Sequence, residues 1–157
     1  MNVDAAFNSS SGQVGVGIVV RNSAGFLVCT AGLVANLASS AAVAEAKSIL
    51  LGAQLAVKKG FFPLCLESDA LNVVNMCKAI SSSRCDIGNL IHDIVETCIG
   101  VVFVDISYTP RSSNFVAHSI AKWALGRFCF TVWESVFPPW LRKISDLDVS
   151  AFFCPGG

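Results

Sequence analysis

The stretch PLCLESDALNVVNMCKAI, residues 63–80, gives the clearest indication of how this chain folds. Its first part, Pro63–Glu67, is a short apolar run bounded by a proline and by Ser68-Asp69, which predicts a strand. The next residues repeat at the i, i+3, i+4, i+7 spacing of one helix face: Val73, Met76, Cys77 and Ile80. A strand therefore leads directly into a helix, with Asp69 at the junction.

Three strand signals precede this unit. Asn2–Phe7 alternates apolar and polar residues, Gly12–Val20 is rich in Gly, Val and Ile, and Phe26–Val34 follows a turn at Arg21–Gly25. Short polar turns between such runs are typical of antiparallel neighbours. We expect three antiparallel strands at the start of the fold.

An Ala-rich segment then predicts the first helix. Ser39 and Ser40 are suitable N-caps, and Gly60 can end the helix after about Lys59. The third helix is predicted by the unbroken apolar stripe within Asp86–Cys98. All three helices would place apolar side chains on a shared core.

The last regular elements are a strand and a helix. Val102–Tyr108 alternates in polarity, which predicts a fifth strand, and a fourth helix is expected from about Ser112 to Leu125. The order β-β-β-α-β-α-α-β-α predicts an α/β fold with a five-stranded mixed sheet flanked by helices. Residues 1–126 would form the domain, and the aromatic, proline-containing tail 127–157 would pack back on it.

Composition limits the classes of protein to consider. The chain has 157 residues, of which 54% are hydrophobic and 14% charged, so one apolar core is expected. The net charge is zero, and the chain therefore lacks the global basic charge that drives tight binding to phosphates. The longest apolar runs, Phe61–Leu66 and Ile99–Val104, fall far short of the roughly 20 residues of a membrane helix.

Compartment is indicated by the N-terminus and the cysteines. No basic region followed by an apolar one opens the chain, so secretion is not expected. The seven cysteines are odd in number, form no C-x-x-C pair and mostly lie in apolar segments. We expect reduced thiols in a monomeric intracellular protein, with nucleus and cytoplasm not distinguished by the sequence.

Three acids are the strongest candidates for chemistry. Asp4 lies in the first strand, Glu45 in the first helix and Asp69 at the carboxyl end of the fourth strand, where open α/β sheets place their sites. Phosphodiester hydrolysis with two magnesium ions needs such clustered oxygen ligands. Glu45 and Asp4 also stand among apolar neighbours, where an unpaired carboxylate is unfavourable and a metal ion would relieve it.

Each acid also has a simpler interpretation when taken alone. Asp4 could be a strand-end charge, Glu45 a solvated helix position and Asp69 the N-cap of the second helix, which base rates favour for Asp69. Only their combination makes a metal site the better interpretation.

Five short motifs carry a family resemblance and occur in order along residues 1–125. They are Asn2–Phe7, Gly15–Arg21, Ala44–Ala46, Glu67–Val74 and the run from Arg111 through Ala117-His118 to Ala121. Together they resemble the plant ribonuclease H-like domain that is related to the reverse-transcriptase-linked ribonucleases H of retroelements. The tail from Val132-Trp133 to Pro139–Leu141 is similar to the usual ending of that family.

The resemblance implies a ribonuclease H-like fold and a hydrolase that cleaves the RNA strand of RNA–DNA hybrids. Its metal-binding acids fall on Asp4, Glu45 and Asp69, with Mg²⁺ as cofactor and Mn²⁺ as a substitute. The fourth acid of the family falls on His118, which we expect as a catalytic residue. A histidine is a poorer magnesium partner than an aspartate, and a partly buried helix histidine without a role is about equally expected.

Nucleic-acid binding would involve Arg111 and Asn114, which precede the fourth helix and could contact phosphate. A polar loop selected only for turn chemistry is about equally expected for both residues. The second and third helices are joined only by residues 81–85, whereas strongly binding bacterial relatives have a basic stretch there. We therefore expect weak, salt-sensitive binding of an RNA–DNA hybrid or other nucleic acid. Glu67 is a lesser candidate for the metal site.

Three functions remain open at this point. The first is the metal-dependent endonuclease. The second is a retroelement-derived domain of the same fold that binds nucleic acid or protein without turnover, which the zero net charge and His118 favour. The third is an unrelated α/β interaction domain, which a structure with the acids far apart would establish.

Overall fold

The computed structural model describes residues 1–79, 86–99 and 104–153. Its strands are β1 Asn2–Phe7, β2 Val14–Arg21, β3 Leu27–Ala35, β4 Leu64–Ser68, β5 Val104–Tyr108 and β6 Thr131–Trp133. Its helices are α1 Ala41–Lys59, α2 Leu71–Ala79, α3 Asp86–Ile99, α4 Phe115–Arg127 and α5 Pro139–Phe153, with a 3-10 turn, η1, at Arg111–Ser113. Ile80, the linker 81–85 and residues 102–103 of the predicted fifth strand lie outside the described residues.

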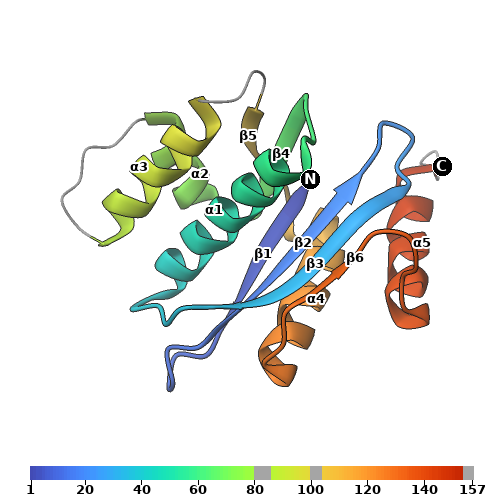
Figure 1. Ribbon diagram of the computed structural model, residues 1–157, viewed down its shortest axis with the longest axis horizontal. Helices are drawn as coiled ribbons and strands as arrows, with labels where there is room; N and C mark the ends of the chain where they lie inside the picture. The colour runs from blue at the N-terminus through green and yellow to red at the C-terminus, as the bar shows by residue number, and fades with distance from the viewer. Residues whose placement is uncertain (80–85, 100–103, 154–157) are drawn as a thin grey trace.

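Within the described parts of the chain, six strands form one mixed sheet in the order β5-β4-β1-β2-β3-β6 (Figure 1). The first three strands are antiparallel neighbours, as predicted, and β4 is parallel to both β1 and β5. The predicted number of five strands is wrong, because β6 pairs with Thr30–Gly32 of β3. A three-residue strand is too short to show alternation, and its position is determined by pairing with an edge.

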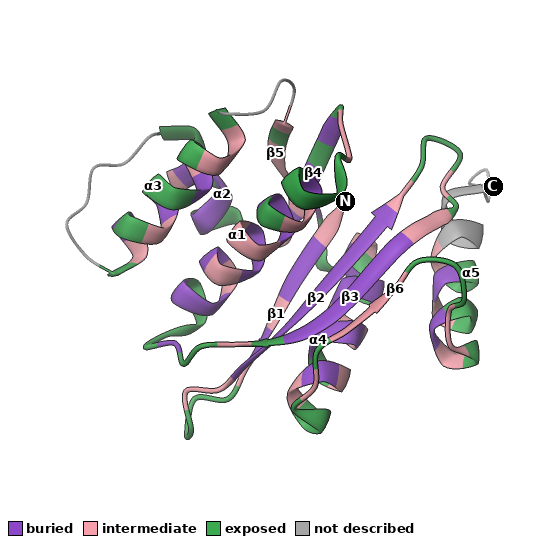
Figure 2. Ribbon diagram, viewed as in Figure 1, coloured by how far each residue is buried: buried purple, intermediate pink, exposed green. Residues whose placement is uncertain are grey.

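Helices cover both faces of the sheet. Figure 1 shows α1, α2 and α3 grouped on one side and α4 on the other, with α5 beside α4. Buried residues are concentrated in β1, β2 and β3 and on the inner sides of α1 and α4 (Figure 2). The mixed sheet with helices on its faces that the element order predicted is therefore observed.

Helix α4 lies directly against the backbone of β2. A Cβ atom at Gly17 would be 2.0 Å from the Ala117 carbonyl oxygen, and one at Gly15 would be 2.3 Å from that of Ala121. Only glycine permits this approach, because the nearest atoms belong to the helix backbone, which cannot move aside. The two glycines thus set the position of α4, and with it the residues that α4 carries toward β1.

The helix ends agree with prediction for α1 and differ for α4. Ser40 caps α1 by accepting the Val43 N–H at 3.2 Å, and Gly60 ends the helix in the left-handed conformation with φ 69°. The fourth helix was expected from Ser112 but begins at Phe115, because Arg111–Ser113 forms the separate 3-10 turn.

The tail packs on the domain through aromatic contacts. The rings of Trp123 in α4, Trp133 in β6 and Trp140 in α5 lie 5.0 to 6.3 Å apart, and Leu141 is fully buried beside them. The division at residue 126 stays a prediction, although β6 completes the sheet.

The cysteines were expected as reduced thiols. Those described, Cys29, Cys65, Cys77, Cys98 and Cys129, are free, while Cys85 and Cys154 lie outside the described residues. No described helix combines the length and apolar character needed to cross a bilayer.

Candidate metal centre

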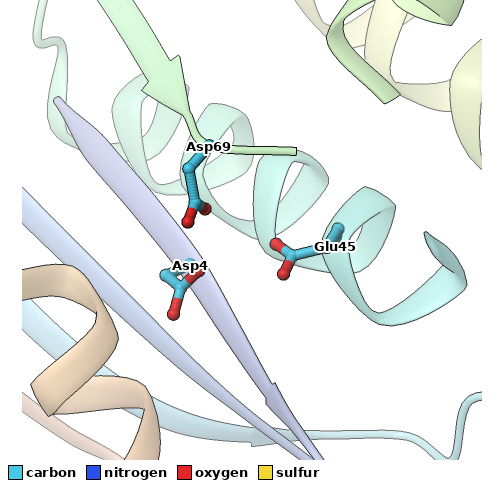
Figure 3. Close-up of side chains that lie close together, drawn as sticks. All are labelled: Asp4, Glu45 and Asp69. Atoms are coloured by element: carbon cyan, nitrogen blue, oxygen red, sulfur yellow. The ribbon is translucent and has the colours of Figure 1, made fainter. Parts of the chain in front are cut away.

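Asp4, Glu45 and Asp69 converge at one place in the fold. One carboxylate oxygen from each lies within 4.8 Å of the others, although the residues come from β1, α1 and the end of β4 (Figure 3). Because the three residues are far apart in sequence, only the packing of β1, α1 and β4 against one another brings them together.

The topology of the sheet explains the convergence. Among the described residues, β1 pairs with β4 only at Asn2 and Glu67, so the two strands are no longer paired where Asp4 and Asp69 stand. Asp69 directly follows β4, and the first helix brings Glu45 to the same opening. A crevice at the carboxyl end of a parallel strand is the usual place for a ligand in such sheets.

Asp4 is the most deeply buried of the three acids, with 1% of its surface exposed. Burial raises the pKa of Asp4 from 3.8 to about 9, and the charges of Glu45 and Asp69 and a hydrogen bond with Asp69 act in the same direction. Without a cation, Asp4 therefore keeps a proton at neutral pH.

Glu45 shows that the cluster is suited to a cation. Burial and the charge of Asp69 raise the pKa of Glu45 to about 7, against the lowering effects of the Ala5 N–H, Arg111 and the Ser48 hydroxyl. Its Oε2 atom is buried and has no hydrogen-bond partner among the described residues. A buried oxygen without a donor, beside two further carboxylates, fits a hard divalent cation.

His118 on α4 contacts the cluster through Asp4. Its Nδ1 lies 2.7 Å from Asp4 Oδ2, and its Nε2 lies 3.2 Å from Arg111 Nη2. A guanidinium only donates hydrogen bonds, so Nε2 is the acceptor and Nδ1 carries the hydrogen that is donated to Asp4. Burial, with the charges of Arg111 and Lys122, lowers the pKa of His118, which agrees with this neutral form.

Arg111 stands at the entrance of the cluster. Its side chain is 69% exposed, and Nη1 lies 3.8 Å from Asp69 Oδ2. It is thus placed to bind an anion from solvent. Lys122, one turn after His118 on α4, acts on the site because its charge lowers the pKa of His118. It was not singled out from the sequence, although the i, i+4 spacing predicts that the two side chains are neighbours on the helix.

Two other expectations need correction. Asn114 was predicted to bind nucleic acid, but it is only 1% exposed, and its amide points to β1 and Asp69 instead of solvent. The 3-10 turn before it withdraws the side chain from the surface. Glu67 does not join the cluster found among the described residues, and its Oε2 accepts a hydrogen bond from Asn2.

The strand order, the helices on both faces and the acid cluster define a ribonuclease H-like domain. A sequence profile of the family described as Reverse transcriptase-like matches residues 2–124. The chain therefore belongs to this family. No curated protein sequence matches the chain.

Solved structures show the same fold. The RNase H1 of the halophilic archaeon Halobacterium salinarum NRC-1 has a TM-score of 0.74 and 23% identity, over 80% of this chain and 96% of that one. The N-terminal RNase H domain of rv2228c from Mycobacterium tuberculosis, solved as a fusion with maltose-binding protein, has a TM-score of 0.70 and 20% identity, over 80% and 91%. LC11-RNase H1, isolated from compost by a metagenomic approach, was solved in complex with an RNA/DNA hybrid and has a TM-score of 0.70 and 13% identity, over 80% and 95%.

Proposed function

We propose that this protein is a metal-dependent endonuclease that hydrolyses the RNA strand of RNA–DNA hybrids. The observation that carries the proposal is the convergence of Asp4, Glu45 and Asp69, with oxygens within 4.8 Å of one another. Family membership supports a nuclease, and the complex of LC11-RNase H1 with an RNA/DNA hybrid supports the substrate class.

Asp4, Glu45 and Asp69 would hold Mg²⁺, or Mn²⁺ in its place. A bound divalent cation supplies a Lewis acid that stabilises charge on phosphate oxygens and lowers the pKa of water. Asp4 has one oxygen engaged by His118, so its other oxygen remains for the cation. His118 would keep Asp4 in place and stay near the reacting phosphate.

Arg111 would bind the phosphate backbone of the substrate. Its exposed guanidinium lies beside Asp69 and can turn to a phosphate oxygen, with which it forms charge-assisted hydrogen bonds. Because the net charge of the chain is zero, we expect weak binding that falls steeply with salt.

A second candidate is a domain of the same fold that binds nucleic acid or protein without turnover. The contact between His118 and Asp4 favours it, because a neutral imidazole brings no negative charge to the place of the fourth acid. A monomeric state, an intracellular location and a plant retroelement origin stay predictions.

The test is cleavage of a labelled RNA–DNA hybrid at low salt with Mg²⁺ or Mn²⁺. We expect Asp69→Asn to reduce the rate about 1000-fold, since loss of a metal ligand removes several kcal/mol of transition-state stabilisation. Asp93→Asn is the matched control. It makes the same chemical change, from aspartate to asparagine, at an exposed position of α3. His118→Asp should raise the rate or leave it unchanged.

Each outcome separates the two candidates. Cleavage that is lost in Asp69→Asn and kept in Asp93→Asn supports the enzyme. If neither the natural chain nor His118→Asp cleaves the hybrid with either metal, the non-catalytic candidate replaces it.

A further inference from the structure

We infer that Asn114 is a positioning residue that aligns Asp4 and Asp69 for the cation. This inference rests on the proposed function, because it concerns the same acids. Asn114 lies between η1 and α4 and is 1% exposed, so it acts inside the protein and does not touch substrate.

The contacts of Asn114 identify which of its atoms matters. Nδ2 donates to the Val3 carbonyl oxygen at 2.9 Å and to Asp69 Oδ1 at 3.2 Å. Both partners are acceptors, so only the amide NH₂ group, with its two hydrogens, can satisfy them together. The orientation of this amide is therefore determined by chemistry.

These two bonds join two of the three acid-bearing segments. Val3 directly precedes Asp4 in β1, and Asp69 follows β4, at the place where the two strands no longer pair. Asn114 bridges this unpaired region in place of sheet hydrogen bonds. It also determines which oxygen of Asp69 is engaged, since Oδ1 accepts from Asn114 while Oδ2 lies toward Arg111.

The backbone of Asn114 also connects it to His118, the fourth residue of the site. Its carbonyl accepts the His118 N–H at 3.0 Å, so Asn114 begins the helical turn that carries His118 to Asp4. That helix is held on β2 at Gly15 and Gly17, which makes it a rigid support. One buried amide is thus tied to β1, Asp69 and the helix of His118.

An ordinary helix-capping role does not explain these contacts. An asparagine at the N-cap normally accepts a backbone N–H of the first turn through its side-chain oxygen. Here the side chain makes no capping hydrogen bond, and Oδ1 has no partner among the described residues. The side chain is therefore oriented by the acid-bearing segments and not by its own helix.

The experiment compares metal affinity with stability. Calorimetric titration with Mn²⁺ and with Mg²⁺ would be done on the natural chain, Asn114→Ala and Asn114→Ser, below their melting temperatures. Serine keeps a residue suited to a helix start but removes the NH₂ group, so it guards against a folding failure. Ser145→Ala is the matched control, because Ser145 is 3% exposed and accepts a hydrogen bond from Arg21, and neither residue belongs to the acid cluster.

We expect both Asn114 variants to bind Mn²⁺ about 10- to 100-fold more weakly, the usual effect of losing a partner of a metal ligand. Ser145→Ala should lower the melting temperature and leave the affinity unchanged. In cleavage assays the Asn114 variants should lose kcat and keep the KM for hybrid, because the side chain is buried.

Natural affinity in both folded Asn114 variants would overturn the inference and leave the proposed function intact. An affinity that falls equally in Ser145→Ala would also overturn it, since general destabilisation would then explain the loss. If the natural chain binds neither metal, the proposed function fails first and the inference falls with it.

Discussion

The two halves of α4 face two different environments. At its N-terminal end, Asn114, which directly precedes α4, and His118 contact Asp69 and Asp4. These two acids lie beside Glu45, whose buried Oε2 has no hydrogen-bond partner among the described residues. In the second half, Trp123 stacks on Trp140 and packs at a tilt against Trp133, and the guanidinium of Arg127 lies 5.6 Å from the centre of the Trp123 ring. The aromatic half supplies stability through apolar contact, and the acidic half reduces it until a cation binds.

The buried ion pair between β2 and α5 also differs from the acid cluster. Arg21 donates to Asp148 at 3.1 Å and to Ser145 at 2.9 Å, so these buried groups have partners. Burial still raises the pKa of Asp148 and lowers the pKa of Arg21, against the effect of their pairing. Desolvation thus outweighs the attraction in this pair as well, but the pair needs no external ion.

The largest expected effect is on the aromatic half. Trp123→Ala should lower the free energy of unfolding by about 3 kcal/mol, because it leaves a cavity among the stacked rings. The Mg²⁺ affinity, measured by titration of the folded variant, should stay unchanged. If Trp123→Ala also lost Mg²⁺ affinity, the aromatic and acidic halves of α4 would be coupled, and they could not be treated as separate environments.

The next effect concerns the buried ion pair. Asp148→Leu should destabilise the protein by about 2 kcal/mol, because Arg21 would remain buried without its carboxylate. Arg21→Met combined with Asp148→Leu should recover part of this loss in urea unfolding. A double variant less stable than Asp148→Leu alone would show that the pair itself is strongly stabilising.

A smaller effect of opposite sign is expected at the acids. Because the pKa of Asp4 is raised from 3.8 to about 9, the folded state binds a proton more tightly than the unfolded chain. Stability of the metal-free protein should therefore fall as pH rises from about 4 to 9. Asp4→Asn should remove the larger part of this slope and raise both the stability and the Tm at pH 8, and the rest of the slope comes from Glu45, whose pKa is raised to about 7.

Binding of Mg²⁺ should have the opposite dependence on pH. Addition of Mg²⁺ should raise the Tm of the natural chain more at pH 8 than at pH 6, because the ligands must lose protons to bind, and should not raise that of Asp4→Asn. Thermal scans at several pH values measure both effects. A Tm of the metal-free natural chain that rises from pH 6 to 8 would contradict the argument.

The smallest effect should come from the exposed ion pair between Lys59 and Glu134. It joins the end of α1 to the segment that follows the edge strand β6. Lys59→Ala should change neither the Tm nor the Mg²⁺ affinity measurably, since solvent screens such pairs. A clear drop in either quantity would identify an unexpected coupling across the sheet.

Much of the fold and part of the candidate site could be predicted from local patterns. The strand and helix around Asp69, the cap at Ser40 and the glycine end of α1 depend on neighbours within a few residues, and all were predicted. Asp4, Glu45 and Asp69 could be chosen as a group because Asp69 follows the carboxyl end of a predicted strand, and because all three acids stand in motifs of the family that the chain resembles.

Other features were outside the reach of local patterns. The three residues of β6 have no periodicity of their own and exist as a strand only because the edge of β3 accepts them. Asn114 was expected in an exposed loop, and its burial depends on how η1 joins α4.

The sequence by itself therefore determined the α/β class and the order of the elements up to the fourth helix, because periodicity and capping are local properties of the chain. The three acids were singled out by the short motifs in which they stand. Only the tertiary structure decided that Asn114 reaches Val3, 111 residues away, and that His118 contacts Asp4, 114 residues away. Contacts at such separations are set by the packing of α4 on β2, where Gly15 and Gly17 let two backbones meet, and no local pattern contains that distance.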